Sequence, residues 1–245
     1  MLADHGKTLI VMPAFNEEES VRQVVIEVLA AFPGIAVLVV DDGSADSTAT
    51  EARAAGALVA QLPFNLGVGG AMRVGFRYAL QNGFDNVVQV DSDGQHDPAS
   101  ILALVSQLDH ADLVIGARFA GAGDYQVRGP RHWAMVVLSK FLSHIARTKL
   151  TDTTSGFKAS GPRAVRLFAD HYPAEYLGDT IESLVIASRA KCVITQVPVS
   201  MRIRAGGRPS HNPLKATAYL GRASMALLFA LIRPPVELAE GSSRS

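Results

Sequence analysis

The sequence contains a single cysteine, Cys192, among its 245 residues. One cysteine excludes an internal disulfide framework and a zinc site built from several cysteines. Long apolar runs are also missing, since the most hydrophobic stretch, 223–232, has about half the roughly 20 residues of a membrane-spanning helix and lies between Arg222 and Arg233. The N-terminus has neither the apolar core nor the cleavage site of a signal peptide. We therefore expect a cytoplasmic protein with no segment that crosses a bilayer by itself.

Net charge is absent as well, because 23 basic residues balance 23 acidic ones. The two halves nevertheless differ. Residues 1–112 hold 15 acids and 5 bases, a net of −10, and residues 113–245 hold 8 acids and 18 bases, a net of +10. This asymmetry suits a first half that gathers cations and a second half that meets phosphates or a membrane surface, although two ordinary solvated faces would look the same. The 48% of hydrophobic residues excludes a disordered or collagen-like chain.

Apolar runs of strand length alternate with helical patterns in the first half, which is typical of βαβ units. Strands are expected over 9–12, 36–40, 58–61, 86–90 and 113–117. Helices are expected after Asn16, near 44–47, over 69–81 and from Pro98 onward. We predict an α/β fold with a mostly parallel central sheet flanked by helices.

The segments that follow the strands are rich in polar residues. Ligands of open α/β sheets bind outside the carboxyl ends of the strands, so these segments are the candidates for a site. They are 13–19, 41–47, 65–70 and 91–97. For Glu18, Asp46 and Ser47 we favour helix capping over ligand binding.

Asp91 and Asp93 predict a metal site. Two carboxylates one residue apart at a strand end point to one side and repel each other unless a cation lies between them. Mg²⁺ or Mn²⁺ is held by one or two carboxylates, with substrate phosphates completing the shell. A metal-diphosphate site is therefore favoured over capping. His96, His132 and His144 lack metal-ligand spacing and are expected at the surface or in the core.

Six motifs carry a resemblance to a known family. They are Pro13-Ala14-Phe15-Asn16-Glu17, Val40-Asp41-Asp42-Gly43-Ser44, Asn65-Leu66-Gly67 with Gly69-Gly70, Asp91-Ser92-Asp93-Gly94-Gln95, Gly116-Ala117-Arg118-Phe119 and Asp152-Thr153-Thr154-Ser155-Gly156-Phe157. In this order and spacing, over residues 8–211, they resemble the inverting family 2 glycosyltransferases of GT-A fold, and among them the dolichyl or polyprenyl phosphate sugar synthases. Phe15 departs from the pattern, because many members carry Tyr there.

The resemblance implies a role for each matching position. Mg²⁺ or Mn²⁺ would be coordinated by Asp91, Asp93 and Gln95. The nucleotide sugar would be bound by Pro13, Ala14, Phe15, Glu17, Asp42, Gly70, Asp91, Ser92, Asp93 and Arg204. The acceptor phosphate would be bound by Arg118, Arg131, Ser155 and Arg208. The catalytic set would be Asp91, Asp93, Arg118 and Arg131. Arginines suit phosphate because the guanidinium offers a fixed bidentate fork.

The same resemblance divides the chain. A GT-A catalytic domain is expected over 1–212, with a nucleotide-binding half at 8–117 and an acceptor half at 118–212. An amphipathic helix over 213–233 and a flexible tail over 234–245 are expected to follow. The chain shows no counterpart of the C-terminal transmembrane helices that many bacterial members carry.

The acceptor is predicted from charge. The stretch 183–236 contains eight Lys and Arg residues and no acid. A sugar hydroxyl needs a general base, whereas a phosphate monoester with a second pKa of about 6 is already an anion and needs a cationic cradle. The composition therefore favours a phosphate acceptor. Together with the resemblance, this implies inverting transfer of a hexose or hexosamine from a UDP- or GDP-linked donor to a polyprenyl phosphate, for cell-envelope glycan assembly.

Three rival functions stay open. A family 2 glycosyltransferase acting on a glycan hydroxyl would need Asp152, Asp179 or Glu182 as general base. A sugar nucleotidyltransferase would carry a basic, Gly-rich loop after the first strand, where this chain has 13–17. An inactive binding module is disfavoured by the intact metal motif.

The segment 213–233 predicts how the chain reaches a lipid. Its apolar stripe and basic flanks suit a position at the inner face of the cell membrane, although the stripe could instead pack on the domain. We expect a peripheral enzyme, with a separate membrane-protein partner or a homo-oligomer left open and no nucleic-acid partner.

Overall fold

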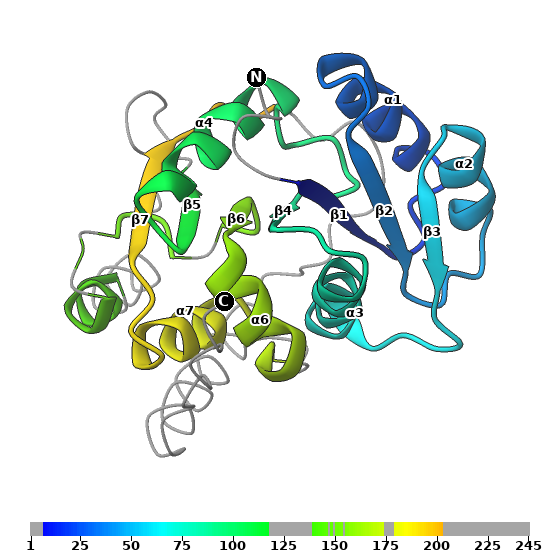
Figure 1. Ribbon diagram of the computed structural model, residues 1–245. Coiled ribbons are helices and arrows are strands. Elements are labelled where there is room, and N and C mark those ends of the chain that lie inside the picture. Colours follow the sequence, from blue (N-terminus) through cyan, green and yellow to red (C-terminus); the bar gives the residue numbers. More distant parts are fainter. Residues whose placement is uncertain are drawn as a thin grey trace, which may run out of the picture.

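Figure 1 shows the computed structural model of the protein. It describes residues 7–117, 139–146, 148, 150–153, 155–173 and 179–202, and the structural statements below concern these residues. The expected helix over 213–233 and the tail over 234–245 lie outside this part of the chain. Within it, no helix is long and apolar enough to cross a membrane.

One seven-stranded sheet forms the centre of the fold, in the order β3-β2-β1-β4-β6-β5-β7. The strands are β1 (Thr8–Ala14), β2 (Ala36–Asp41), β3 (Leu58–Gln61), β4 (Asn86–Gln89), β5 (Leu113–Ala117), β6 (Lys158–Ser160) and β7 (Ile194–Pro198). All neighbouring pairs are parallel except those of β6, which runs antiparallel between β4 and β5. The prediction of a mostly parallel sheet with its five strands is confirmed, and β6 and β7 join the two halves of the chain in one sheet.

Helices cover both faces of this sheet. They are α1 (Val21–Ala31), α2 (Thr48–Ala54), α3 (Gly67–Gln81), α4 (Ile101–Ser106), α6 (Pro162–His171) and α7 (Asp179–Arg189), with short 3-10 turns η2 (Pro98–Ser100) and η3 (Gln107–Asp109) beside α4. Helices α1, α2 and α4 pack on one face, and α3, α6 and α7 pack on the other (Figure 1). Residues 139–146 are also helical.

The alternation of apolar side chains in β1 explains the two layers. Leu9 and Val11 are buried against α3 and its neighbours, whereas Ile10 and Met12 are buried against α1 and α4, because successive strand residues point to opposite faces. Gly75 lets α3 lie close to β1, since a Cβ atom there would be 2.4 Å from Cγ1 of Val11.

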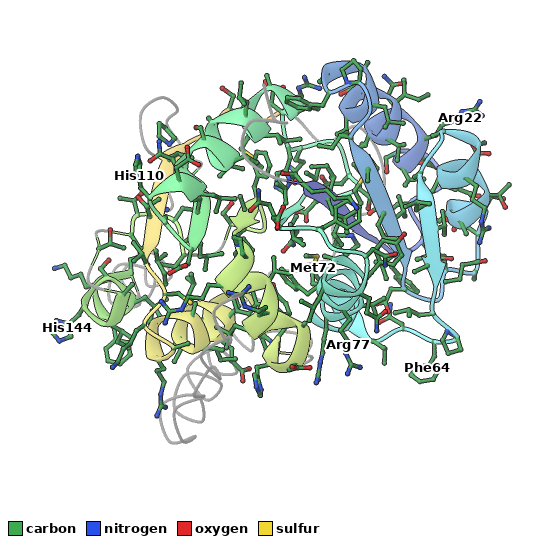
Figure 2. The ribbon with its side chains drawn as sticks, in the orientation of Figure 1. Arg22, Phe64, Met72, Arg77, His110 and His144 are labelled. Atoms are coloured by element: carbon green, nitrogen blue, oxygen red, sulfur yellow. The ribbon has the colours of Figure 1, made fainter. Side chains whose placement is uncertain are left out.

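Helix α3 buries one of its faces. Met72 points from α3 toward the core, whereas Arg77 of the same helix points away from the sheet (Figure 2). The exposed residues of α3 also include the apolar Val68 and Leu80. Pro98 opens η2 as predicted, with the Asp97 carboxylate accepting a hydrogen bond from the Ala99 amide at 3.1 Å.

The antiparallel direction of β6 places the site. Gln89, the last residue of β4, lies opposite Lys158, the first residue of β6. The segment that enters β6 therefore lies at the same edge of the sheet as the segment that leaves β4. The polar segments after β1 and β2 reach this edge too, because those strands are parallel to β4.

Candidate active site

The segments after β1 and β2 are joined by hydrogen bonds between their backbones and short side chains. The Asn16 amide donates to Oγ of Ser44, and the Ala45 amide donates to Oδ1 of Asn16, both at 2.9 Å. Asn16 takes a positive φ of 54°, a conformation that Asn adopts more readily than most residues. These contacts hold the expected nucleotide loop against the start of α2.

Capping explains two of the three residues for which it was predicted. The Asp46 carboxylate accepts hydrogen bonds from the amides of Thr48 at 3.0 Å and Glu18 at 3.2 Å. The Glu18 carboxylate accepts from the Ser47 amide at 2.9 Å. The prediction was wrong for the Ser47 side chain, which makes no capping bond, because Asp46 already occupies the end of the helix. Burial alone would raise the pKa of Asp46, but its hydrogen bonds from Thr48 and Glu18 together hold that pKa below its ordinary value.

Asp42, expected beside the nucleoside, is buried and bound to the beginning of α3. Its carboxylate accepts hydrogen bonds from the amides of Leu66 and Gly67, both at 2.7 Å. Burial raises the pKa of Asp42, the two amide bonds partly offset this, and the charge of Asp41 adds to the rise. A carboxylate at a helix N-terminus also interacts favourably with the helix dipole. This cap explains why α3 begins at Gly67, two residues before the expected start.

Some of the other residues expected to bind the nucleotide are buried in the fold, and one is exposed. Pro13 and Ala14 are buried in β1, and the carbonyl oxygen of Pro13 accepts a hydrogen bond from Oγ of Ser92 at 3.1 Å. Gly70 packs on Leu66, whose Cβ atom would be 2.4 Å from an added Cβ atom. Phe15 differs from these, because 43% of its surface is exposed at the end of β1. An exposed aromatic ring at this position is available for stacking on a base.

The Glu17 side chain also has a partner within its own loop. Its Oε2 atom accepts a hydrogen bond from Oγ of Ser20 at 2.9 Å, and its amide donates to the Thr48 hydroxyl at 2.9 Å. Glu17 therefore helps to shape the loop before α1.

The two aspartates of the expected metal site lie directly after β4. The Asp91 side chain is 39% exposed, whereas Asp93 is buried and accepts a hydrogen bond from the Gln95 amide at 3.0 Å. Gln89 approaches Asp91 from the strand, with its Nε2 atom 3.5 Å from Oδ1. The loop after β4 thus contains one partly exposed carboxylate, Asp91, and one buried and hydrogen-bonded carboxylate, Asp93.

His96 belongs to this loop and lies in the core, one of its two expected locations. Its side chain is 3% exposed, its Nδ1 atom accepts a hydrogen bond from the Asp91 amide at 3.0 Å, and its Nε2 atom lies 3.5 Å from Oδ2 of Asp91. The imidazole stacks on the ring of Phe157, with centroids 4.5 Å apart and planes inclined by 10°.

The motif at 152–157, which contains the expected acceptor ligand Ser155, is called the acceptor motif below, and residues 91–97 are called the metal loop. Gly156 of the acceptor motif lies against the metal loop, as the topology requires. A Cβ atom on Gly156 would lie 3.1 Å from Oδ2 of Asp91. Ser155 is buried, and its Oγ atom accepts a hydrogen bond from the Phe157 amide at 3.3 Å. Asp152 is 1% exposed.

The segment after β7 also passes the metal loop. The Arg202 amide donates to the carbonyl oxygen of Gln95 at 2.9 Å, and Met201 forms a bridge with His96. The Arg202 guanidinium pairs with Glu27 at 2.6 Å and Asp97 at 2.9 Å. Arg202, the last residue that the structure describes, therefore lies beside the metal loop. Arg118, Arg131, Arg204 and Arg208 themselves lie outside the described residues.

The donor set fits a divalent cation completed by substrate. Among the residues that the structure describes, no group of three or more His, Cys, Asp or Glu side chains could hold a metal ion. Two carboxylates with a neighbouring amide side chain, left open for phosphate oxygens, are the type of site that Mg²⁺ uses with nucleotides. The Asp91 side chain is 39% exposed, so a ligand can reach its carboxylate from solvent.

Three contacts of the metal loop were not predicted from the sequence. They are made by Gln89, Gly156 and Arg202. Gln89 could have been found from the strand period, because it lies two residues before Asp91 and shares its face. The contacts of Gly156 and Arg202 depend on the pairing of β6 and the path after β7, for which no local pattern exists.

Comparison with known proteins identifies the family of this chain. Residues 9–171 match the family Glycosyl transferase family 2. A polyprenol monophosphomannose synthase from Mycolicibacterium smegmatis is 34% identical over 171 residues, covering 62% of this chain and 61% of that protein. An undecaprenyl-phosphate mannosyltransferase from Micrococcus luteus is 31% identical over 202 residues, covering 79% of this chain and 83% of that protein. This chain therefore spans less than two thirds of the first of these relatives.

Solved structures show the same fold. Glucosyl-3-phosphoglycerate synthase from Mycobacterium tuberculosis, crystallised with Mn²⁺, UDP and phosphoglyceric acid, has a TM-score of 0.72 at 22% identity, covering 95% of this chain and 81% of that one. The α/β sheet with its flanking helices is thus the GT-A fold that the motifs predicted. By its family match, its relatives and this fold, the chain belongs to glycosyl transferase family 2.

Proposed function

We propose that the protein transfers a hexose or hexosamine, with inversion, from a UDP- or GDP-linked sugar to a polyprenyl phosphate. The observation that carries this proposal is the contact between the metal loop and the acceptor motif, in which Gly156 lies beside the Asp91 carboxylate. Donor and acceptor groups bound to these two segments would meet at one edge of the sheet.

The donor side would use the carboxylates after β4. Asp91, Asp93 and Gln95 would hold Mg²⁺ or Mn²⁺, which supplies positive charge to a diphosphate leaving group when it is bound. Phe15 would stack on the base, and Asp42 would fix the loop beneath it by holding the start of α3. The relative crystallised with Mn²⁺ and UDP shares the fold and supports a divalent cation here.

The acceptor side would use cations. In the proposed step an acceptor phosphate oxygen forms a bond to the anomeric carbon, while the bond from that carbon to the donor diphosphate breaks and its electron pair leaves with the nucleoside diphosphate. The phosphate nucleophile is already ionised, so no general base is required. Arg118, Arg131 and Arg208 would hold the phosphate, with Ser155 nearby and Arg204 on the donor.

The relatives favour a phosphate over a sugar hydroxyl. Two of them are named polyprenol monophosphomannose synthase and undecaprenyl-phosphate mannosyltransferase. A third, from Methanococcus voltae and 26% identical, is named as a UDP-N-acetylglucosamine–dolichyl-phosphate transferase, which leaves the sugar and the base open.

The location follows from the acceptor. A polyprenyl chain lies in a membrane and nucleotide sugars lie in the cytoplasm, so the proposed enzyme works peripherally at the inner face of the cell membrane. A separate membrane protein would serve as its anchor.

The direct test is an assay of the full chain with a panel of nucleotide sugars, Mn²⁺ and a short polyprenyl phosphate, with products identified by mass. A polyprenyl-phosphate sugar is the expected product. The matched control replaces the lipid phosphate with the corresponding polyprenol. Transfer to the polyprenol or to a glycan instead would overturn the proposed acceptor, and a nucleotide sugar made from a sugar phosphate would replace the proposed class of reaction.

A further inference from the structure

We infer that His96 is a positioning residue that fixes the Asp91 carboxylate for metal binding and links it to the acceptor motif. This inference rests on the metal site of the proposed function. No metal-ligand role for His96 is involved.

His96 contacts Asp91 through both nitrogens of its ring. The Asp91 amide donates to Nδ1 at 3.0 Å, so in the neutral imidazole the proton is on Nε2. That Nε2 atom lies 3.5 Å from Oδ2 of Asp91. One ring therefore holds the backbone of Asp91 by a hydrogen bond and lies against its side chain.

Phe157 fixes the plane of that ring. The two rings stack at 4.5 Å, and Phe157 is fully buried directly before β6. An antiparallel β-bridge between His96 and Met201 holds the backbone of the loop. An imidazole confined in this way cannot rotate without breaking its contacts with Asp91.

These contacts distinguish positioning from simple packing. A buried ring that only filled space would be replaced by Phe at little cost to the site, because Phe also stacks on Phe157. Replacement by Phe leaves the Asp91 amide without its acceptor and removes the polar ring atom that lies 3.5 Å from Oδ2. Partners that orient a metal-binding side chain typically change metal affinity 10- to 100-fold when mutated.

The test measures Mn²⁺ binding by electron paramagnetic resonance at one fixed pH, with Mn²⁺ alone and with UDP or GDP. His96→Phe should weaken Mn²⁺ binding by about 10- to 100-fold. His96→Asn should recover part of the loss, because the Asn side-chain oxygen can accept the Asp91 amide bond in place of Nδ1. Asp91→Asn gives the value for a site without its carboxylate.

His110→Phe is the matched control and should leave Mn²⁺ binding unchanged. The His110 side chain is exposed and lies far from α3, β1 and β2 (Figure 2). Thermal unfolding checks that each variant is folded, and His96→Asn decides the question if His96→Phe does not fold. Wild-type affinity in His96→Phe, or no recovery in His96→Asn relative to it, overturns the inference while the metal site stands. A wild-type chain that binds no Mn²⁺ overturns the metal site and this inference with it.

Discussion

An added Cβ atom on Gly156 would lie 3.1 Å from Oδ2 and 3.2 Å from Oδ1 of Asp91. These distances are shorter than ordinary van der Waals contact, so the backbone of the acceptor motif lies as close to the metal-site carboxylate as a residue without a side chain allows. The contact exists because β6 is antiparallel to β4, which brings the chain before β6 to the end of β4. The two motifs therefore lie side by side at one end of the sheet.

Gly156→Ala should displace the Asp91 carboxylate while leaving the fold intact. The Asp91 carboxylate would have to shift by a few tenths of an ångström. This is less than the roughly 1 Å that can cost about 10²-fold in rate, so we expect a smaller loss in kcat, together with weaker Mn²⁺ binding. Gly161→Ala is the control, because its Cβ atom would meet no atom closer than 3.5 Å. Steady-state kinetics and Mn²⁺ titration of both variants measure the effect. Equal kinetics for the two variants would show that the Asp91 carboxylate can move without cost.

The sequence was sufficient to predict the first five strands because each is a run of apolar residues that alternates with a helix. Leu58–Gln61 and Leu113–Ala117 have the predicted bounds. β6 was missed because it has three residues, two of them the polar Lys158 and Ser160, and no pattern of that length identifies a strand. Its antiparallel insertion is a result of tertiary packing.

The site was predictable only in its local part. Asp91 and Asp93 were identified because strand geometry and charge repulsion act within three residues. The cap that Asp42 provides for α3 and the contacts of His96 with Asp91 and Phe157 depend on side-chain packing between segments, which a single sequence does not reveal. The roles of Arg118 and Arg131 stay predictions.

Asp91→Asn and Asp93→Asn should each abolish transfer, because an amide cannot replace the negative charge that holds a divalent cation. Donor binding should weaken as well, while circular dichroism and thermal unfolding remain close to wild type. Addition of EDTA to the wild-type enzyme should have the same effect, and Mn²⁺ or Mg²⁺ should restore activity. Full activity in EDTA, or in either variant, would remove the metal from the proposed mechanism.

Arg118→Lys and Arg131→Lys test whether these residues bind phosphate. An ammonium keeps the charge but cannot form the bidentate fork of a guanidinium. We expect each variant to lose at least about tenfold in kcat/KM, equivalent to roughly 1.4 kcal/mol. Separate titrations of donor and lipid phosphate show which substrate each residue binds. Wild-type kinetics in both variants would assign these arginines to the surface.

Asp46 should make stability depend on pH on the acid side. Its hydrogen bonds from Thr48 and Glu18 keep its folded-state pKa below the unfolded value, so the stabilisation is complete above the unfolded pKa and is lost as the pH falls through the folded pKa. Asp46→Asn removes the charge but keeps a capping oxygen, so it should lower the free energy of unfolding at pH 7 by less than the roughly 1 kcal/mol that loss of a whole cap costs. Urea unfolding at pH 7, 5 and 3 should show this difference shrinking toward pH 3. Asp170→Asn, at an exposed carboxylate, is the control, and a pH-independent difference for Asp46→Asn would contradict the assignment.

The segment 213–233 should bind the protein to anionic membranes. Its period places Leu214, Ala218, Met225, Leu228 and Phe229 on one stripe, flanked by basic residues, and apolar burial and attraction to anionic headgroups act together on such a helix. The full chain should sediment with anionic vesicles, less so with neutral ones, and less at high salt because the charges are screened. A chain ending at Pro213, shown by circular dichroism to be folded, should lose this binding. Equal binding by the two chains, or none by the full chain at low salt, would mean that the stripe packs on the domain or on a protein partner, and the acceptor would then have to be delivered by that partner.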